Sequence, residues 1–292
     1  MKTLTFYSYK GGVGRSTTLC NIAYSLVEMG KKVVLIDFDI ESSGLYPIIL
    51  REACPSHGMI WQNILIAPDK FRVAELLKNS LVATPFKNLS LIPAGIDPIS
   101  TAKVNDRFGR DKKQIHANVS TAISILEDEY DFDYLFFDSR AGISNIAEPA
   151  FTYADGIFLC YRLGVQQLVG IQGLVSWLIH YFTDIDSTNV KFFLMGSNIF
   201  ETLDIQDQLK CFVEDTKELI DENKTKLGLT GDDLFPVTDM GVLWQTPFLN
   251  MYGSSILFRV VQDLSENDIS KFKINDALRL YKNLSQKLLD TL

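Results

Sequence analysis

Short apolar runs alternate with amphipathic stretches along the chain. The run Val33-Val34-Leu35-Ile36 has no polar position, as in a parallel strand that is covered on both faces. In the stretches between such runs, apolar residues recur every three to four positions, the period of a helix with one buried face. The pattern predicts an α/β fold, a mostly parallel sheet with helices on both faces in three layers. The predicted strands are Thr3–Tyr7, Lys32–Asp37, Leu89–Pro93, Tyr134–Asp138, Gly156–Tyr161 and Lys191–Ser197, and the predicted helices are Ser16–Met29, Phe71–Lys78, Val119–Glu129, Gln166–Phe182 and Ile205–Glu222.

Two segments need a separate interpretation. Residues 46–88 do not follow the alternation clearly, and we interpret them as an insertion that faces a partner, within a single domain spanning residues 1–292. The last segment, Asn275–Leu292, forms an amphipathic helix with both signs of charge on its polar face. Because it lacks the basic excess that anionic lipid selects, we expect it to pack onto the sheet rather than bind a membrane. Its apolar face consists of Ala277, Leu278, Tyr281, Leu284 and Leu288.

Composition narrows the class of protein. A chain of 292 residues with 47% hydrophobic residues has enough apolar surface for a substantial core. The N-terminus lacks the pattern of a signal peptide, and no apolar run approaches the roughly 20 residues that span a bilayer, so we expect a soluble, cytoplasmic protein without a membrane span. The net charge of −8 repels nucleic acid on average.

Neither a disulfide scaffold nor a metal site is predicted from the cysteines and histidines. The four cysteines are widely spaced and form no C-x-x-C pair, which is typical of reduced thiols. The three histidines match no spacing of metal ligands. These residues are Cys20, Cys54, Cys160 and Cys211, and His57, His116 and His180.

A glycine-rich segment, Lys10-Gly11-Gly12-Val13-Gly14-Arg15-Ser16-Thr17, lies between the first predicted strand and the first predicted helix. Glycines allow a tight turn whose N–H groups converge on one point, and the helix adds the positive end of its dipole, so the segment suits phosphate binding. Arg15 is placed to reach the outer phosphates, and the Ser16 hydroxyl suits Mg²⁺. A plain glycine-rich turn is the structural alternative.

A dinucleotide-binding fingerprint is the sharper rival, because Gly12 and Gly14 follow a strand and Asp37 ends the next strand. Thr17 stands where that fingerprint requires a third glycine. The rival also gives no role to Lys10 and Ser16, so we favour a phosphate loop for a nucleoside triphosphate.

Carboxylates at the ends of two strands support this interpretation. Asp37 and Asp39 follow the second strand, and Asp138 ends the apolar run Tyr134–Asp138. In open α/β sheets the ligand lies at the carboxyl edge, where these residues would meet. We expect Asp39 to orient the water that attacks the terminal phosphate, and Asp138 to hold Mg²⁺ directly or through water.

Together these residues resemble the ParA/MinD group of deviant Walker A ATPases, in the SIMIBI class of P-loop NTPases, over most of the chain. The loop is similar to the family loop, Asp39 to its catalytic aspartate, and Asp138 with the following Ser139-Arg140-Ala141-Gly142 to its Walker B strand and second switch. Asn198 and Pro236, which we expect to end a strand, resemble the family residues near adenine. The resemblance therefore implies ATP and Mg²⁺ as cofactors, with Gly11, Gly12, Val13, Gly14, Arg15, Ser16, Thr17, Asn198 and Pro236 binding the nucleotide, and Ser16 and Asp138 binding the metal.

The resemblance also implies an Mg-dependent ATPase that forms a homodimer with nucleotide between its subunits. Lys10 would act in catalysis by reaching the phosphate of the partner subunit, and a further protein would read the ATP- or ADP-bound state. The KGGVGR sequence is closest to a subgroup linked to prokaryotic defence or conflict modules. Arg15 departs from the second lysine usual in the family, and because its planar guanidinium is bulkier than an ammonium, we expect binding with slow hydrolysis.

Three other functions stay open. An ATP-binding scaffold with little hydrolysis follows from the change at Arg15. A metabolic ligase on the same fold is a second option, because a fold does not fix a function. A DNA-partition ATPase is suggested by a basic stretch, although Asp106 and Asp111 interrupt it and a solvated loop of mixed charge explains it as well. The basic stretch consists of Lys103, Arg107, Arg110, Lys112 and Lys113.

Overall fold

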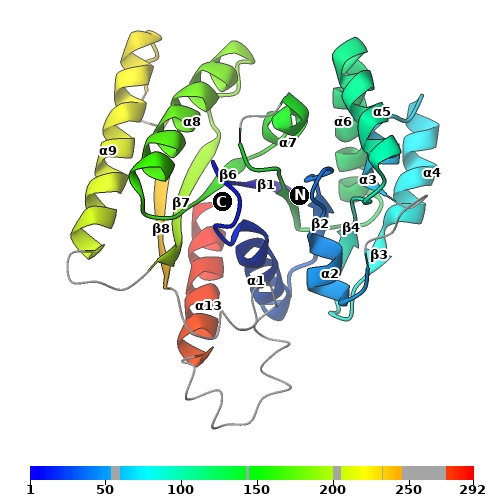
Figure 1. Cartoon of the computed structure of the whole chain (residues 1–292), viewed down its shortest axis with the longest axis horizontal. Coiled ribbons are helices and arrows are strands. Elements are labelled where there is room, and N and C mark those ends of the chain that lie inside the picture. The colour runs from blue at the N-terminus through cyan, green and yellow to red at the C-terminus, as the bar shows by residue number, and fades with distance from the viewer. Residues whose placement is uncertain (54–59, 143–144, 200–204, 232, 245–273) are drawn as a thin grey trace.

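The computed structural model describes residues 1–53, 60–142, 145–199, 205–231, 233–244 and 274–292 (Figure 1). Its strands form one sheet of eight, in the order β3-β4-β2-β5-β1-β6-β7-β8. All neighbouring pairs are parallel except β3 with β4. The strands are β1 (Lys2–Tyr7), β2 (Val33–Asp37), β3 (Val82–Ala83), β4 (Leu89–Ile92), β5 (Tyr134–Asp138), β6 (Gly156–Tyr161), β7 (Lys191–Ile199) and β8 (Val237–Trp244).

Helices cover both faces of this sheet (Figure 1), which confirms the predicted fold class. One face packs against α1 and α13, and the opposite face packs against α8 and α9 on one half and α3, α4 and α6 on the other. The helices are α1 (Arg15–Glu28), α2 (Leu45–Leu50), α3 (Trp61–Leu65), α4 (Lys70–Ser80), α5 (Pro98–Arg110), α6 (Lys112–Asp128), α7 (Glu148–Thr152), α8 (Val165–Asp184), α9 (Ile205–Lys226) and α13 (Ile274–Thr291), with a 3₁₀ turn at Asn145–Ala147.

The central strands are apolar because both of their faces are buried. Every residue of β2, β5 and β6 is buried, including the unbroken run Val33–Ile36. Such a strand cannot show the alternation of a half-solvated strand. The polar residues Asp37 and Asp138 come only at the last position of β2 and β5, where the backbone reaches the edge of the sheet.

The C-terminal helix α13 packs onto α1 and the sheet, as the amphipathic pattern predicts. Tyr281 and Leu288 are fully buried, and Leu284 is nearly so, in the same core cluster as residues of α1 and β1. None of the helices in the described ranges is long and apolar enough to cross a membrane.

The described part of residues 46–88 is folded onto the rest of the chain. Trp61, Ile64 and Leu65 of α3 are fully buried, together with Val73 and Leu77 of α4, in the cluster that covers β2 and β5. Phe71 of α4 is 77% exposed. A role of this segment toward a partner stays a prediction.

Helix α5 was missed by the periodicity, and α6 begins at Lys112 rather than at Val119. Both starts carry a local signal. Asp97 caps α5 by accepting from the backbone N–H groups of Ile99 and Ser100, with Pro98 at the first helical position, and Asp111 caps α6 in the same way through Gln114. The basic stretch 103–113 is therefore helical, and its interpretation as a loop is wrong.

Candidate functional site

The phosphate loop connects the end of β1 to the start of α1. Gly12 and Gly14 have φ of 74° and 86°, a left-handed conformation that favours glycine. The hydroxyl of Ser197, on β7, donates a hydrogen bond to the carbonyl of Val13. A Cβ at Gly14 would lie 3.0 Å from that Ser197 oxygen. The loop is therefore fixed both by its glycines and by a strand two positions away in the sheet.

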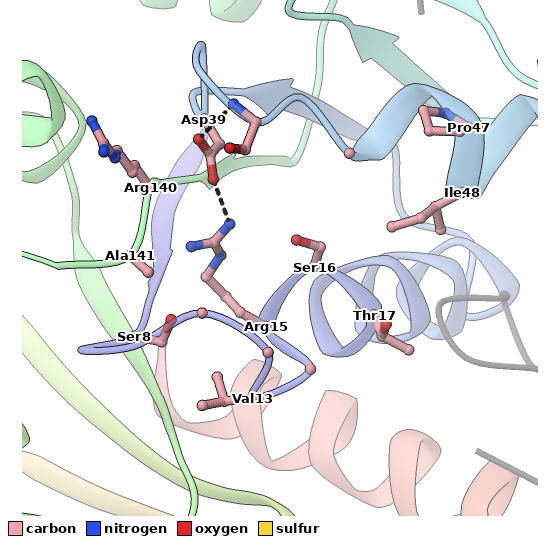
Figure 2. Close-up of a pocket in the computed structure, with 15 residues that line it drawn as sticks. Ser8, Val13, Arg15, Ser16, Thr17, Asp39, Pro47, Ile48, Arg140 and Ala141 are labelled. Atoms are coloured by element: carbon pink, nitrogen blue, oxygen red, sulfur yellow. Dashed lines mark hydrogen bonds and ion pairs between the residues drawn. The ribbon is translucent and has the colours of Figure 1, made fainter. Parts of the chain in front are cut away.

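A pocket of about 600 Å³ opens above this loop (Figure 2). The loop and the first turn of α1 form its floor, and the segments that follow β2 and β5 form its walls. Figure 2 shows the Arg15 side chain extending from the loop to Asp39, with Ser16 beside it at the start of α1. The lining residues are Ser8, Gly11, Gly12, Val13, Gly14, Arg15, Ser16, Thr17, Asp39, Ser42, Gly44, Pro47, Ile48, Arg140 and Ala141.

The floor of the pocket fits a phosphate group. Helix α1 begins at Arg15 after Gly14, which has no side chain to cap the first N–H groups, and its first turn holds no acidic residue. These donors and the positive end of the helix dipole therefore remain for an anion. The buried hydroxyl of Ser8, which also lines the pocket, has no hydrogen-bond partner within the described ranges. A phosphate oxygen would satisfy these groups.

Arg15 is the main cation of the pocket, and it is buried against two carboxylates. Its Nε lies 2.6 Å from Oδ1 of Asp138, and its Nη2 lies 3.4 Å from Oδ2 of Asp39. Burial opposes a charged guanidinium, but the two carboxylates outweigh it and raise the pKa of Arg15. Burial likewise raises the pKa of Asp138, while Arg15 and a hydrogen bond from Ser16 partly oppose that rise. The guanidinium thus joins the ends of β2 and β5.

Asp37 is fully buried and organises the loop that carries Asp39. One carboxylate oxygen accepts from the backbone N–H of Asp39, and the other accepts from the hydroxyl of Ser43 and the N–H groups of Gly44 and Leu45. Burial and the nearby charge of Asp138 raise the pKa of Asp37 to about 7. Because these oxygens are turned to their own loop, Asp37 is not available to a ribose, and the dinucleotide alternative loses its acidic residue.

The oxygen groups beside Arg15 fit Mg²⁺. Ser16 helps to lower the pKa of Asp138, so a hydroxyl and a carboxylate lie close together next to the phosphate loop. Within the described ranges no group of three or more histidine, cysteine, aspartate or glutamate residues could hold a metal ion. A site of this kind suits Mg²⁺, which keeps waters and takes its remaining ligands from the phosphates of a nucleotide. Ser16 and Asp138 would hold the ion, which would neutralise charge on the phosphate oxygens.

Lys10 lies outside this pocket. Its Nζ donates to Oε1 of Gln166, 2.6 Å away in the first turn of α8. Lys10 and Gln166 line a neighbouring groove of about 550 Å³ together with Tyr9 and Gly170. The side chain of Lys10 is thus directed away from the phosphate site of its own chain.

The predictions for the two residues expected near adenine, Asn198 and Pro236, differ in how they compare with the structure. Asn198 belongs to β7, and its side chain lies outside the described part of the chain. Pro236 precedes β8 rather than ending a strand, and its carbonyl accepts from the N–H of Phe192 near the start of β7. In parallel strands this is the edge opposite to the phosphate loop, so the expected place of Pro236 beside the base is wrong. Proline is tolerated at the beginning of a strand, which explains its position.

The basic stretch is largely neutralised by neighbouring acids. Arg107 pairs with Asp111, Arg110 with Asp106, and Lys112 with Glu148. Cys20 and Cys160 are buried as free thiols, and Cys211 is an exposed free thiol. Nδ1 of His180 donates a hydrogen bond to the carbonyl of Ser176. Cys54 and His57 lie outside the described residues.

Two residues of the site carried no clear sequence signal. Ser8 follows β1 and Ser197 lies within β7, and nothing in their spacing distinguishes these single serines. Arg140 lines the pocket and its Nη1 lies 2.6 Å from Oε1 of Glu41, so an ion pair joins the segments that follow β5 and β2. This pair depends on the neighbouring positions of β2 and β5, which the sequence does not state.

Comparisons with known proteins identify the family. A family model described as an AAA domain matches residues 1–192. The septum site-determining protein MinD of Helicobacter pylori is 34% identical over 152 residues, which is 52% of this chain and 49% of that protein, so the match spans about half the length of this relative. A virulence plasmid ParA family protein of Chlamydia psittaci is 23% identical over 240 residues, 76% of this chain and 86% of that protein.

A solved structure supports the same fold. The septum site-determining protein MinD from Pyrococcus horikoshii, complexed with Mg-ADP, superimposes with a TM-score of 0.62 at 16% identity and covers 98% of this chain and 95% of that one. Because the family model matches more than half of the chain, the chain belongs to the AAA domain family as a ParA/MinD-like P-loop ATPase.

Proposed function

We propose that this chain is an ATP-binding, slowly hydrolysing dimerisation switch that regulates a partner protein. The observation that carries the proposal is that the two cations of the phosphate loop point to different places. Arg15 lies inside the phosphate pocket, and Lys10 lies outside it, where its Nζ donates to Gln166 of α8. A lysine directed away from the phosphates of its own chain is placed to reach those of a second copy.

Each group of the pocket then has a role in the switch. The N–H groups of residues 11–17 bind the phosphates, Ser16 and Asp138 hold Mg²⁺, and Asp39 orients the attacking water. The Mg-ADP bound to the Pyrococcus horikoshii relative supports this assignment of cofactors. Lys10 supplies positive charge to the partner's nucleotide, so ATP favours the dimer and hydrolysis releases it.

A protein partner in the cytoplasm would bind the dimeric state. Because of the KGGVGR loop, we further propose that the switch belongs to a prokaryotic defence or conflict module. We do not propose a DNA-partition role, because three residues of the basic stretch are paired with acids. An ATP-binding scaffold is the second candidate, favoured by the contact of Arg15 with the catalytic candidate Asp39.

Light scattering tests the switch directly. Solution mass is measured without nucleotide, with Mg²⁺ and ADP, and with Mg²⁺ and ATP, while conversion of ATP to ADP is followed in the same samples. We expect a monomer that becomes a dimer only with ATP and returns as ADP accumulates. A dimer that persists while no ADP forms would favour the scaffold, and an unchanged monomer would contradict the switch.

A further inference from the structure

Each carboxylate oxygen of Asp39 has a partner within the chain. Oδ1 accepts from the backbone N–H of Ser42 at 3.1 Å, and Oδ2 lies 3.4 Å from Nη2 of Arg15. Asp39 and Arg15 are only 8% and 9% exposed, so solvent screens this contact little. A carboxylate in this state has reduced capacity to accept a hydrogen bond from water.

We propose that Arg15 is a brake on hydrolysis, holding Asp39 in an inactive contact while it binds the phosphates. The inference rests on the proposed ATP-binding function and assigns the cause of slow turnover to one side chain. Arg15 is thus a positioning residue for Asp39 in addition to a phosphate ligand.

The chemistry explains why this contact slows the reaction. In hydrolysis the water oxygen bonds to the terminal phosphorus, the bond to the bridging oxygen breaks, and its electron pair leaves with ADP. The water loses one proton, and a carboxylate that accepts a hydrogen bond from this water aligns it and receives that proton. A guanidinium, which stays charged at every accessible pH, stabilises the negative charge on Oδ2 and fixes the direction of the carboxylate, so Asp39 aligns and deprotonates the water less well while the contact is made.

The shape of the guanidinium allows it to hold both contacts while phosphate is bound. Arg15 uses Nε for Asp138 and Nη2 for Asp39, two nitrogens at fixed positions in one plane. Arginine has five N–H donors, so others remain for a phosphate oxygen. An ammonium has a single nitrogen and cannot reproduce the two contacts at their separate places, although it still binds phosphate as a point charge.

The variant Arg15→Lys separates the brake from phosphate binding. Calorimetry with the non-hydrolysable analogue AMP-PNP, with and without Mg²⁺, measures binding, and single-turnover assays measure hydrolysis of ATP. We expect affinity within about threefold of the wild type. The hydrolysis rate should rise by about tenfold, a part of the roughly 10²- to 10⁴-fold that a positioned acid–base group contributes. Arg72→Lys, an exposed arginine on α4, is the matched control.

A second measurement tests the contact itself in the nucleotide-free protein. Thermal midpoints are compared for the wild type, Arg15→Lys, Asp39→Asn and the double variant. If Arg15 holds Asp39, Asp39→Asn lowers the midpoint in the wild type and changes it much less in the Arg15→Lys background.

The outcomes separate this inference from the proposed function. Equal or slower hydrolysis by Arg15→Lys at retained affinity would overturn the brake alone, as would additive thermal effects. Loss of AMP-PNP binding by Arg15→Lys would show that Arg15 acts only as a phosphate ligand, which also overturns it. Absence of AMP-PNP binding by the wild type would overturn the proposed function together with the brake.

Discussion

At the scale of single residues, Arg15 is the side chain on which the site depends most. It is the cation between Asp39 and Asp138, and both acids are nearly buried. Arg15→Ala should abolish tight nucleotide binding, lowering affinity by about 100-fold or more because a charged phosphate contact is lost. The free energy of unfolding should also fall by about 3–5 kcal/mol, since the variant leaves buried carboxylates unpaired. Calorimetry and urea unfolding check the two effects, and unchanged nucleotide affinity would refute the first.

Asp37 gives a pH dependence that can be assigned to one residue. Its pKa is raised to about 7 from an ordinary value of 3.8, chiefly by burial. The folded chain therefore binds a proton more tightly than the unfolded chain, so this residue makes stability fall as the pH rises from about 4 to 7. Asp37→Asn should flatten that fall in the free energy of unfolding. Urea unfolding across this pH range tests it, and an equally steep fall in the variant would contradict the assignment.

At the scale of elements, the contact between the phosphate loop and α8 rests on one glycine. A Cβ at Gly170 would lie 2.1 Å from Cδ1 of Tyr9, so the ring lies directly on the backbone of α8. Gly170→Ala should displace Tyr9 and with it Lys10, at a cost of about 1–3 kcal/mol from overpacking. A Cβ at Gly173, on the same helix, meets nothing within 4 Å. Gly173→Ala is thus the matched control, and equal unfolding midpoints for both variants would contradict this role of Gly170.

At the scale of the whole molecule, the position of Lys10 links the loop to association. Lys10→Ala removes the cation that we expect to reach the second copy, without touching the residues that line its own pocket. The variant should therefore retain binding of ATP to the monomer and weaken the ATP-dependent dimer by about tenfold or more, as for a charge-assisted contact. Sedimentation or light scattering over a range of protein concentrations measures this. Dimerisation of the variant equal to that of the parent would count against a nucleotide sandwich.

Local sequence was sufficient for the central strands, for the phosphate loop and for the helices with a clear apolar period, but not for α5 or the start of α6. Unbroken apolar runs such as Val33–Ile36 identified the central strands because burial on both faces leaves no place for polar residues. Glycines at positions 12 and 14 required a tight turn, and the structure gives both a positive φ. Asp39 and Asp138 were predicted at one edge because the carboxyl ends of parallel strands coincide.

Only the tertiary structure decided which side chains meet. Arg15 contacts residues 24 and 123 positions away, and Lys10 contacts one 156 positions away, so these pairs follow from strand order and side-chain direction rather than from any local period. Pro236 is a further example, since the residues next to it in the sequence do not show whether it begins or ends a strand. The spacing of apolar residues along the chain predicts which positions are buried, because buried positions favour apolar residue types. Contact between distant charges depends on how the whole sheet is assembled, and that information is not local.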